Sequence, residues 1–338
     1  MTKEILQVAQ DLCGFKLKYH LAPCGDKVKK ETGTAIPSES IRIFGRCDAA
    51  LKGPVGDTVR DFVVAFRQNF DLYANIRPAI SYPSICPPAL RPDINLVTIR
   101  ENSEGLYKSI ENEVAPGVWI SIGVYTVEAC KRIAKFSFDY TRRRLKNGSG
   151  KGQLVVATKM NIFRKTHTMF YEAFKDMSPS FPEIELTHFY ADALCAHLVR
   201  RPQDFDVIVS ENLLADLLSD LAGEIAGGLG MTAGTNINPE KRIGLFEPTH
   251  GCAPDIVGTG KANPIGQIRS AALMLEFLGL VHEDSRCSEA AVRIERATRA
   301  LLTQRKKTKM PIELGGKAET DEVGRTIASF MKSKYSAR

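Results

Sequence analysis

The sequence predicts an α/β protein large enough to form two domains. Short apolar runs alternate with stretches of helical apolar spacing along its 338 residues, and this alternation is typical of a sheet covered by helices. Apolar residues make up 43% of the chain and charged residues 25%, the ordinary balance of a globular protein with a sizeable core. Neither an internal repeat nor a low-complexity segment interrupts the pattern.

The individual elements follow from the two periodicities. Strands are expected in the short runs of β-branched, aromatic and leucine residues at 95–99, 153–158, 185–190 and 205–210. Helices are expected where apolar residues recur every three or four positions, at 126–146, 165–177, 211–226, 265–279 and 288–304. The first helix closes with three arginines before Asn147, as cations favour a helix C-terminus. The proline-rich stretch from Tyr82 to Pro92 is predicted to be a surface loop.

Composition argues against several classes of protein. No apolar stretch approaches the length of a membrane helix, and charges scattered through the first twenty residues argue against a signal peptide, so a cytoplasmic protein is expected. The eight cysteines form no CxxC pair and are interpreted as isolated thiols. The net charge of +7 comes with short basic runs that lack interleaved aromatics, which favours small anionic ligands over nucleic acid.

The usual dinucleotide fingerprint is missing. No strand is followed by GxGxxG, and the glycines at 148–152 precede a strand instead. The run at 258–261 resembles part of a phosphate loop but lacks the upstream glycine. If a dinucleotide binds, an architecture other than the Rossmann fold binds it.

Residues 206–220 carry the most informative polar pattern. A strand ends at Ser210, and the helix that follows bears Asp216 and Asp220 at i, i+4 spacing, on one face. A divalent cation such as Mg²⁺ would offset the repulsion between these carboxylates. Two solvated aspartates fit this segment equally well.

Three arginines and one Gly- and Pro-rich stretch are further candidates for ligand binding. Arg67, Arg77 and Arg100 could converge on a di- or tricarboxylic acid, because guanidinium groups bind carboxylates in pairs of hydrogen bonds, although each alone resembles a surface arginine. The Gly- and Pro-rich stretch 246–264 could press its backbone against a ligand while Asp255 contacts ribose hydroxyls. By itself, it could equally be an ordinary surface loop.

Together these segments resemble the isocitrate and 3-isopropylmalate dehydrogenase family. The matches run in the family's order from about residue 1 to residue 330: Arg67 through Arg77-Pro78, RENSEGLY at 100–107, Lys159-Met160-Asn161, ADA at 191–193, ENLLADLLSD at 211–220, EPTHGCAPDIVGTGKANP at 247–264 and LGGKAETDEV at 314–323. The resemblance implies an isopropylmalate dehydrogenase-like two-domain fold with a mixed parallel and antiparallel sheet. It further implies a cofactor-binding domain of residues 1–72 plus 227–338, and a dimerisation and metal-binding domain of residues 73–226.

The resemblance also implies a role for each matched residue. Arg67, Arg77 and Arg100 would hold the substrate's carboxylates, with Tyr107 and Lys159 as the catalytic acid–base pair. Asp192, Asp216 and Asp220 would bind Mg²⁺ or Mn²⁺. Lys159 and Asp192 would reach in from the partner subunit of a homodimer, with pairing of dimers into tetramers left open. Asn161 would lie near the nicotinamide, and the adenosine would contact His250, Gly251, Ala253, Asp255, Ile256 and Asn263.

These roles imply an NAD-dependent oxidative decarboxylation of a 3-carboxy-2-hydroxy acid. The metal would act as a Lewis acid at the hydroxyl and carboxylate. Lys159 would serve as the base during hydride transfer, and Tyr107 would protonate the enol that follows decarboxylation. Asp255 can accept hydrogen bonds from free ribose hydroxyls but would repel a 2′-phosphate, so we expect NAD as the cofactor.

The exact acid is a finer expectation. Isocitrate enzymes resemble one another in having Ser and Asn six and four residues before the first substrate arginine, whereas this chain has Asp61 and Val63 there, followed by Val64. Asp61 would repel a third carboxylate, and an apolar wall of Val63 and Val64 suits an isopropyl group. Against this, Arg60 could pair with a third carboxylate. We therefore expect 3-isopropylmalate, and a role in leucine biosynthesis, with isocitrate or homoisocitrate as the alternative.

Two other expectations concern the chain as a whole. A non-catalytic regulatory subunit would be expected to lose the lysine, tyrosine or aspartates, and all are present. Family members begin with a buried strand and a GDGIGPEV-like loop, which this sequence lacks. We expect the natural protein to be longer by about fifteen residues, because losing that strand would leave backbone groups beside it unpaired.

Overall fold

A single mixed sheet organises the chain. The computed structural model describes residues 1–82, 93–304 and 306–333, so most of the predicted loop from Tyr82 to Pro92 lies outside the described residues. Within these ranges eight strands line up in the order β1 (Ala49–Leu51), β10 (Ile243–Pro248), β9 (Ala233–Asn238), β2 (Ala74–Ile80), β3 (Asn95–Glu101), β8 (Val207–Ser210), β6 (Gln153–Thr158) and β7 (Glu185–Tyr190).

The sheet combines parallel and antiparallel pairs, as predicted. β10, β9, β2 and β3 form a run of antiparallel neighbours, whereas β3, β8, β6 and β7 are parallel, as are β1 and β10. Parallel neighbours require helical crossovers, which accounts for the helices between β6, β7 and β8. The predicted α/β class and mixed sheet are confirmed.

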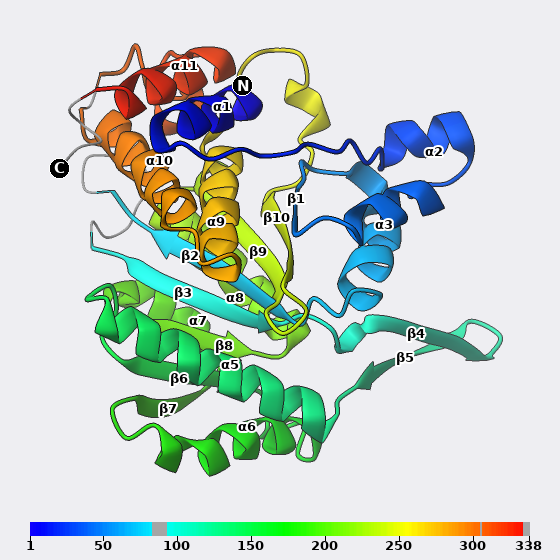
Figure 1. Cartoon of the computed structure of the whole chain (residues 1–338). Coiled ribbons are helices and arrows are strands. Elements are labelled where there is room, and N and C mark those ends of the chain that lie inside the picture. The colour runs from blue at the N-terminus through cyan, green and yellow to red at the C-terminus, as the bar shows by residue number, and fades with distance from the viewer. Residues whose placement is uncertain (83–92, 305, 334–338) are drawn as a thin grey trace.

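The helices follow the chain order seen in Figure 1. They are α1 (Thr2–Cys13), α2 (Asp26–Thr32), α3 (Ser38–Phe44), α4 (Val59–Phe62), α5 (Val127–Lys146), α6 (Thr166–Met177), α7 (Ala191–Arg200), α8 (Asn212–Ala226), α9 (Ile265–Val281), α10 (Ser285–Thr303) and α11 (Thr320–Met331). A turn of π-helix, η2 (Val63–Gln68), continues α4. Several short 3₁₀ turns complete the described part.

Side-chain alternation along the strands separates two apolar layers. Val97, Ile99, Val207 and Val209 face a large core formed with α5, α6, α9 and α10. The residues between them, such as Leu96 and Ile208, face a second core under α7 and α8. A third cluster, of Phe44, Phe62, Phe66, Leu72, Ile243 and Leu245, packs around α3, α4 and η2. The central strands of the sheet are thus buried on both faces, as is usual where parallel strands are covered by helices.

The predicted elements are present with small shifts at their ends. β6 and β7 have the predicted bounds, β3 continues to Glu101, and β8 begins at Val207. α5, α6, α8, α9 and α10 match the five predicted helices within three residues at each end. Thr126 caps α5, whose last turn is basic as expected. The structure adds strands β2, β9 and β10, which the apolar patterns did not predict.

Two features lie at the edges of this body. The hairpin of β4 (Gly105–Ala115) and β5 (Val118–Val124) projects away from it as a long arm (Figure 1). β1 is one edge strand of the sheet, and residues 15–24 before α2 adopt no regular structure. The expectation of additional residues before Met1 stays a prediction, as does the division into two domains.

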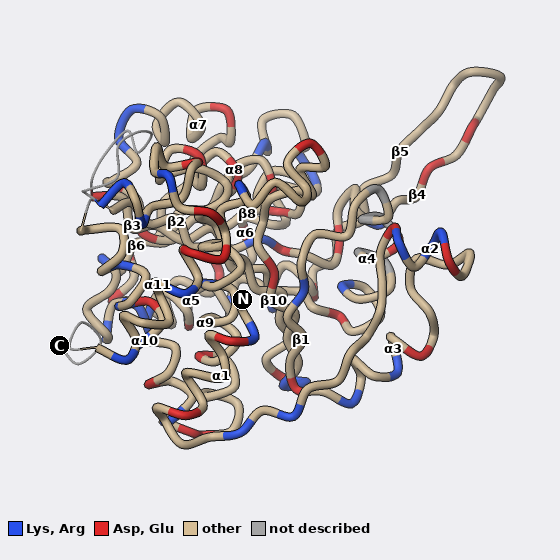
Figure 2. The backbone as a smooth tube through the Cα atoms, turned by 90° about the horizontal axis from the view of Figure 1, so that it is seen from above, with Lys and Arg blue, Asp and Glu red and all other residues tan. Residues whose placement is uncertain are grey.

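Surface and membrane properties agree with the composition. Basic and acidic positions are interleaved along the backbone in Figure 2. None of the helices in the three described ranges is long and apolar enough to cross a bilayer. Seven cysteines within those ranges are free thiols, as the absence of paired spacing predicted.

Candidate active site

A row of polar side chains crosses one face of the sheet. Glu247 on β10, Asn236 on β9 and Asn75 on β2 are linked by hydrogen bonds of 2.9 Å, with Asn236 donating to Glu247 and Asn75 donating to Asn236. All three are buried, so satisfied hydrogen bonds are needed to offset their loss of water. Beyond Asn75 the row continues with Arg77 and Arg100, whose strands are antiparallel neighbours.

Helix α8 lays a polar face over these two arginines. Asn212, Asp216, Ser219 and Asp220 recur at the spacing of one helical face, which packs on β2 and β3. The Arg77 guanidinium donates through Nη1 to Ser219 at 2.9 Å and pairs with both aspartates at 3.0 Å. The predicted placement of the two aspartates on one face is therefore correct.

Arg100 lies deepest in the site, with 1% of its surface exposed. Its Nε donates to Asn212 at 2.8 Å, and its Nη1 forms an ion pair with Asp216. The guanidinium also lies over the ring of Tyr107, 4.6 Å from the centroid. The Tyr107 hydroxyl donates to the other oxygen of Asp216 at 2.5 Å. Tyr107 therefore reaches the centre of the site from the base of the β4–β5 arm.

The charges in this cluster shift one another's pKa values. Burial, together with the nearby Arg77 and Arg67, lowers the pKa of Arg100 to about 10. Burial would raise the pKa of Asp216, but Arg100 and Arg77 outweigh it and lower the pKa below its ordinary value. For Asp220, burial and the neighbouring Asp216 raise the pKa against the effect of Arg77.

Burial likewise raises the pKa of Tyr107, although Arg100 opposes that shift. A phenol with a raised pKa keeps its proton at neutral pH and can donate it to a strong base. The cluster therefore contains Asp216 with a lowered pKa and Asp220 with a raised pKa, beside Tyr107 as a proton donor.

Arg67 approaches the cluster from η2 and is held by Glu247. Its Nη2 donates to Glu247 at 3.0 Å, while Lys52 pairs with the other carboxylate oxygen at 2.6 Å. Burial alone would raise the pKa of Glu247, but Lys52 and Arg67 hold it far below its ordinary range. The carboxylate therefore stays ionised and fixes Arg67 in position.

Two buried donors in the site have no partner among the residues that the structure describes. Nε of Arg67 and Nη2 of Arg100 make no hydrogen bond to that part of the chain, although both atoms are buried. An unsatisfied buried donor on a charged group is costly, and such groups in native structures call for an explanation. A carboxylate ligand would satisfy both atoms, because guanidinium donors match its oxygens.

Lys159 and Asp192 form a separate pair. Lys159 directly follows β6, Asp192 lies in the first turn of α7 after β7, and their Nζ and Oδ2 atoms are 2.8 Å apart. Within the described ranges of a single chain, no three acidic, His or Cys side chains stand close enough to share a metal ion. Asp192 therefore does not join Asp216 and Asp220 within one chain, and its expected contribution to a partner subunit's site stays a prediction.

The predicted cofactor residues lie in the exposed loop between β10 and α9. Ala253 adopts a left-handed conformation, and Asp255 and Ile256 form a 3₁₀ turn directly after it. Asn263 is buried and accepts from the backbone of Ile265 at the start of α9. Thr320 of α11 donates to the carbonyls of residues 260 and 262, which anchors the far end of the loop. His250 and Gly251 complete the loop's near end, where the His250 ring contacts the Gly251 carbonyl.

The other predicted residues are less informative. Asn161 is exposed in the turn after β6. The side chains of Val63 and Val64 lie outside the part of the chain that the structure describes. Asp61 forms a half-exposed ion pair with Lys29 at 3.5 Å, so its negative charge is partly countered.

Comparison with known proteins identifies the family. The family model described as isocitrate/isopropylmalate dehydrogenase matches residues 1–327. The chain belongs to this family. It is therefore a decarboxylating dehydrogenase.

Individual relatives carry different substrate names. The chain is 40% identical to 3-isopropylmalate/3-methylmalate dehydrogenase of Methanocaldococcus jannaschii, over 95% of this chain and 92% of that protein. It is 36% identical to isocitrate/homoisocitrate dehydrogenase of Thermus thermophilus, over 95% and 91%. The crystal structure of isocitrate dehydrogenase from Methylococcus capsulatus superposes with a TM-score of 0.88 at 33% identity, covering 98% and 95%.

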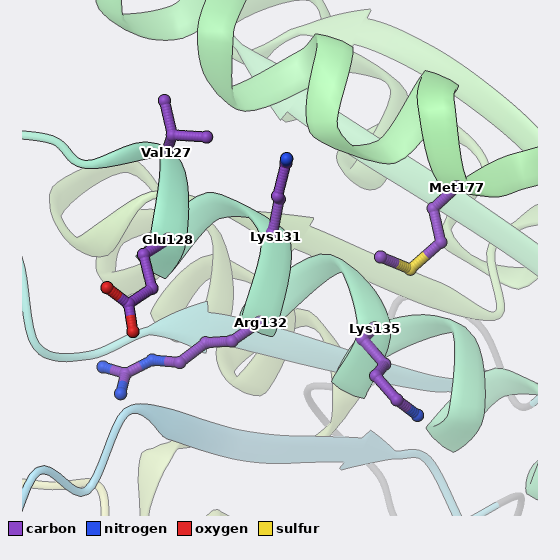
Figure 3. Close-up of a pocket in the computed structure, with 6 residues that line it drawn as sticks. All are labelled: Val127, Glu128, Lys131, Arg132, Lys135 and Met177. Carbon is purple, nitrogen blue, oxygen red and sulfur yellow. The ribbon is translucent and has the colours of Figure 1, made fainter.

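A surface hollow elsewhere on this dehydrogenase is not part of the cluster. Five of its lining residues belong to α5, and the sixth, Met177, ends α6 (Figure 3). Two of its cations are already paired, Arg132 with Asp71 at 2.7 Å and Lys135 with Asp139 at 2.6 Å. The hollow is therefore separate from the arginine–aspartate cluster of β2, β3 and α8.

Sequence reasoning missed several residues of this dehydrogenase's site. Glu247 begins the matched segment 247–264, and Lys52 directly follows the short apolar strand β1. Nothing in the local sequence pattern indicated that their side chains form an ion pair. Asn212 and Ser219 share the helical face of Asp216, and that spacing could have revealed them. His167, whose ring contacts the backbone of Lys159, carried no recognisable signal.

Proposed function

We propose that the chain catalyses the NAD-dependent oxidative decarboxylation of 3-isopropylmalate. The observation that carries this proposal is the cluster itself, in which buried arginines with unsatisfied donors surround a pair of helix-borne aspartates within the described residues. Such a site suits a dicarboxylate substrate beside a divalent cation.

The aspartates are suitable ligands for Mg²⁺ or Mn²⁺. Both Oδ1 atoms lie 3.0 Å from the same Arg77 nitrogen, so the two carboxylates face the same region of the site. Oxygen donors of this kind are what hard divalent cations prefer. Asp216 and Asp220, with Asp192 of a second subunit, would hold the metal. When bound, it supplies Lewis-acid stabilisation of negative charge on the substrate oxygens.

The chain's own residues would carry the proton transfers. Lys159 would take the proton of the C2 hydroxyl as C2 is oxidised to a 2-oxo acid, and NAD, when bound, would supply the hydride acceptor. The bond from C3 to its carboxylate then breaks, carbon dioxide leaves, and the electron pair forms an enolate. Tyr107 donates a proton to C3 and restores the ketone. Arg67, Arg77 and Arg100 hold the carboxylates and so fix the orientation of the breaking bond.

The cofactor choice rests on the loop between β10 and α9. Asp255 is exposed there, where a carboxylate can accept hydrogen bonds from ribose hydroxyls. A 2′-phosphate would meet its negative charge, so NAD is favoured over NADP. One relative, the human mitochondrial isocitrate dehydrogenase subunit alpha, carries NAD in its name.

Isocitrate or homoisocitrate is the second candidate. Asp61 was expected to repel a third carboxylate, but its ion pair with Lys29 weakens that repulsion. The name of the Thermus thermophilus relative also includes both acids. The higher identity to relatives named for 3-isopropylmalate supports the first choice.

A homodimer is part of the proposal, because Lys159 and Asp192 would complete the partner's site. Two surfaces support it. The β4–β5 arm exposes apolar side chains, including Val114, Val118 and Trp119, of which Trp119 is 66% exposed. Val199 of α7 and Leu217 of α8 are exposed as well. Exposed apolar side chains on these elements suit a contact with another chain, which supports the proposed dimer.

The test is formation of NADH with Mg²⁺ and each acid in turn. We expect 3-isopropylmalate to give the highest kcat/KM among isopropylmalate, isocitrate, homoisocitrate and malate, and malate, which lacks a substituent at C3, to give the lowest. A higher kcat/KM with isocitrate than with 3-isopropylmalate would make isocitrate the preferred substrate. Equal rates with NAD and NADP would contradict the role of Asp255. As a control, the Asp216→Asn variant should give no NADH with any of the four acids.

A further inference from the structure

A buried histidine holds the backbone of the proposed catalytic lysine. The amide of Lys159 donates to Nδ1 of His167 at 2.9 Å, across a turn that joins β6 to α6. Only 2% of His167 is exposed. To accept this hydrogen bond, Nδ1 must carry a lone pair, so the ring is neutral and its proton is on Nε2.

The surroundings keep the ring neutral and fixed. Its centroid lies 4.9 Å from that of Phe163 and 5.7 Å from that of Tyr125, so aromatic side chains from two segments contact it. Burial lowers the pKa of His167 to about 4, which leaves the imidazole uncharged at neutral pH.

The same turn is closed by backbone hydrogen bonds. Phe163 donates to the carbonyl of Lys159 at 2.9 Å, and His167 donates to the carbonyl of Phe163 at 3.1 Å. The peptide groups on both sides of Lys159 are therefore engaged, with the imidazole accepting from its amide. The direction in which the lysine leaves β6, toward Asp192, depends on this fixed backbone.

We propose that His167 is a positioning residue for Lys159: its neutral imidazole accepts the hydrogen of the lysine's backbone amide and so orients the Nζ atom toward its place of action. This inference rests on the acid–base role proposed for Lys159. His167 is buried and is not one of the groups proposed to bind the substrate. Its effect is on geometry, and a displacement of about 1 Å at a reacting group can cost about a hundredfold in rate.

Two variants separate the hydrogen bond from ring packing. His167→Asn places a side-chain oxygen near the position of Nδ1 and keeps the acceptor, but it loses most of the ring. His167→Phe keeps an aromatic ring against Phe163 and Tyr125 but offers no acceptor. Both are compared with the wild-type protein for kcat and KM with the best acid, for thermal midpoint, and for hydrogen exchange of the Lys159 amide.

We expect the acceptor to decide activity. In His167→Phe, kcat should fall about tenfold to a hundredfold with KM within about threefold, because binding groups are untouched. The Lys159 amide should exchange at least about tenfold faster than in the wild type. In His167→Asn, kcat and exchange should stay within about threefold of the wild type, even if its thermal midpoint is lower.

Other outcomes overturn the inference. Full activity and slow exchange in His167→Phe would show that the hydrogen bond is dispensable. A loss of kcat in both variants that follows their thermal midpoints would reduce His167 to a packing residue. The exchange measurement needs no substrate, so it tests the hydrogen bond separately. A wild-type protein that oxidises none of the four acids would overturn the proposed function, and with it this role for His167, even if the exchange pattern is as expected.

Discussion

Replacing Arg100 with lysine separates its structural role from its substrate role. In the free protein Arg100 makes two polar contacts, from Nε to Asn212 at 2.8 Å and from Nη1 to Asp216, while its Nη2 has no partner among the described residues. A lysine ammonium keeps the charge and can still reach one acceptor. It loses the forked geometry that serves Asn212 and a substrate carboxylate at once.

The expected magnitudes follow from the lost hydrogen bonds. A hydrogen bond to a charged group contributes about 1.5–3 kcal/mol. Loss of the contact with Asn212 should therefore lower the free energy of unfolding by about 1.5–3 kcal/mol, with or without substrate. Loss of the bond from Nη2 to the substrate should lower kcat/KM by about 10-fold to 150-fold, since about 1.36 kcal/mol corresponds to a factor of ten.

The assay combines urea unfolding with steady-state kinetics on Arg100→Lys. Arg325→Lys on the exposed face of α11 is the matched control and should change neither quantity. A variant that loses stability as expected but keeps kcat/KM within about threefold of the wild type would contradict this role, because Nη2 would then take no part in holding the substrate.

Three further predictions concern charge. Glu247→Gln leaves Lys52 and Arg67 without a counter-charge, so it should lower the free energy of unfolding at pH 7 by about 3–5 kcal/mol. The pKa of Glu247 in the folded protein lies below its ordinary value of 4.5, so its contribution to stability is present above that pH and is lost as the pH falls below it. Urea unfolding from pH 5 to pH 3 should therefore show a smaller loss of unfolding free energy in the variant than in the wild type. Equal losses in the two proteins would contradict this role of Glu247. The pKa of His167 is lowered from 6.5 to about 4, so the unfolded chain binds the proton first and stability should fall as the pH drops from about 6.5 to about 4. The thermal midpoint should decline over this pH range in the wild type and decline less in His167→Asn. The same decline in both proteins would count against a buried neutral ring. Asp255→Lys should raise the NADP-to-NAD ratio of kcat/KM by at least about tenfold, measured by NADPH and NADH absorbance, and an unchanged ratio would remove Asp255 from cofactor selection.

Much of the site could be predicted because its residues share local patterns. Asp216 and Asp220 recur at helical spacing after a strand, and Arg100 lies one residue before the end of β3, whose apolar run is clear. Periodicity alone therefore placed these side chains on the elements that carry them, and the family resemblance supplied their roles. The buried parallel strands β6 and β8 could be predicted because they are nearly continuous apolar runs, and β7 because its leucine, threonine and aromatic residues favour a strand.

What could not be predicted depends on contacts between distant segments. Arg67 and Glu247 are 180 residues apart, and no spacing rule connects them. Strands β2 and β9 bury the polar side chains of Asn75, Arg77 and Asn236, which hydrogen-bond to one another. These polar residues hide the alternation of apolar and polar positions by which a strand is recognised in a sequence. The contact of His167 with Lys159 depends on the turn between β6 and α6, whose conformation no composition rule specifies.

Complementation between two inactive variants tests whether each active site is shared between subunits. A Lys159→Ala chain and an Asp216→Asn chain, carrying different tags, are co-expressed, and mixed dimers are purified through both tags. If Lys159 serves the partner's site, one of two sites is intact and the mixed dimer should show about half of the wild-type kcat. As a control, a chain with both substitutions paired with a wild-type chain should be inactive. An inactive mixed dimer together with a control that is about half-active would contradict the shared site, because each site would then be complete within one chain.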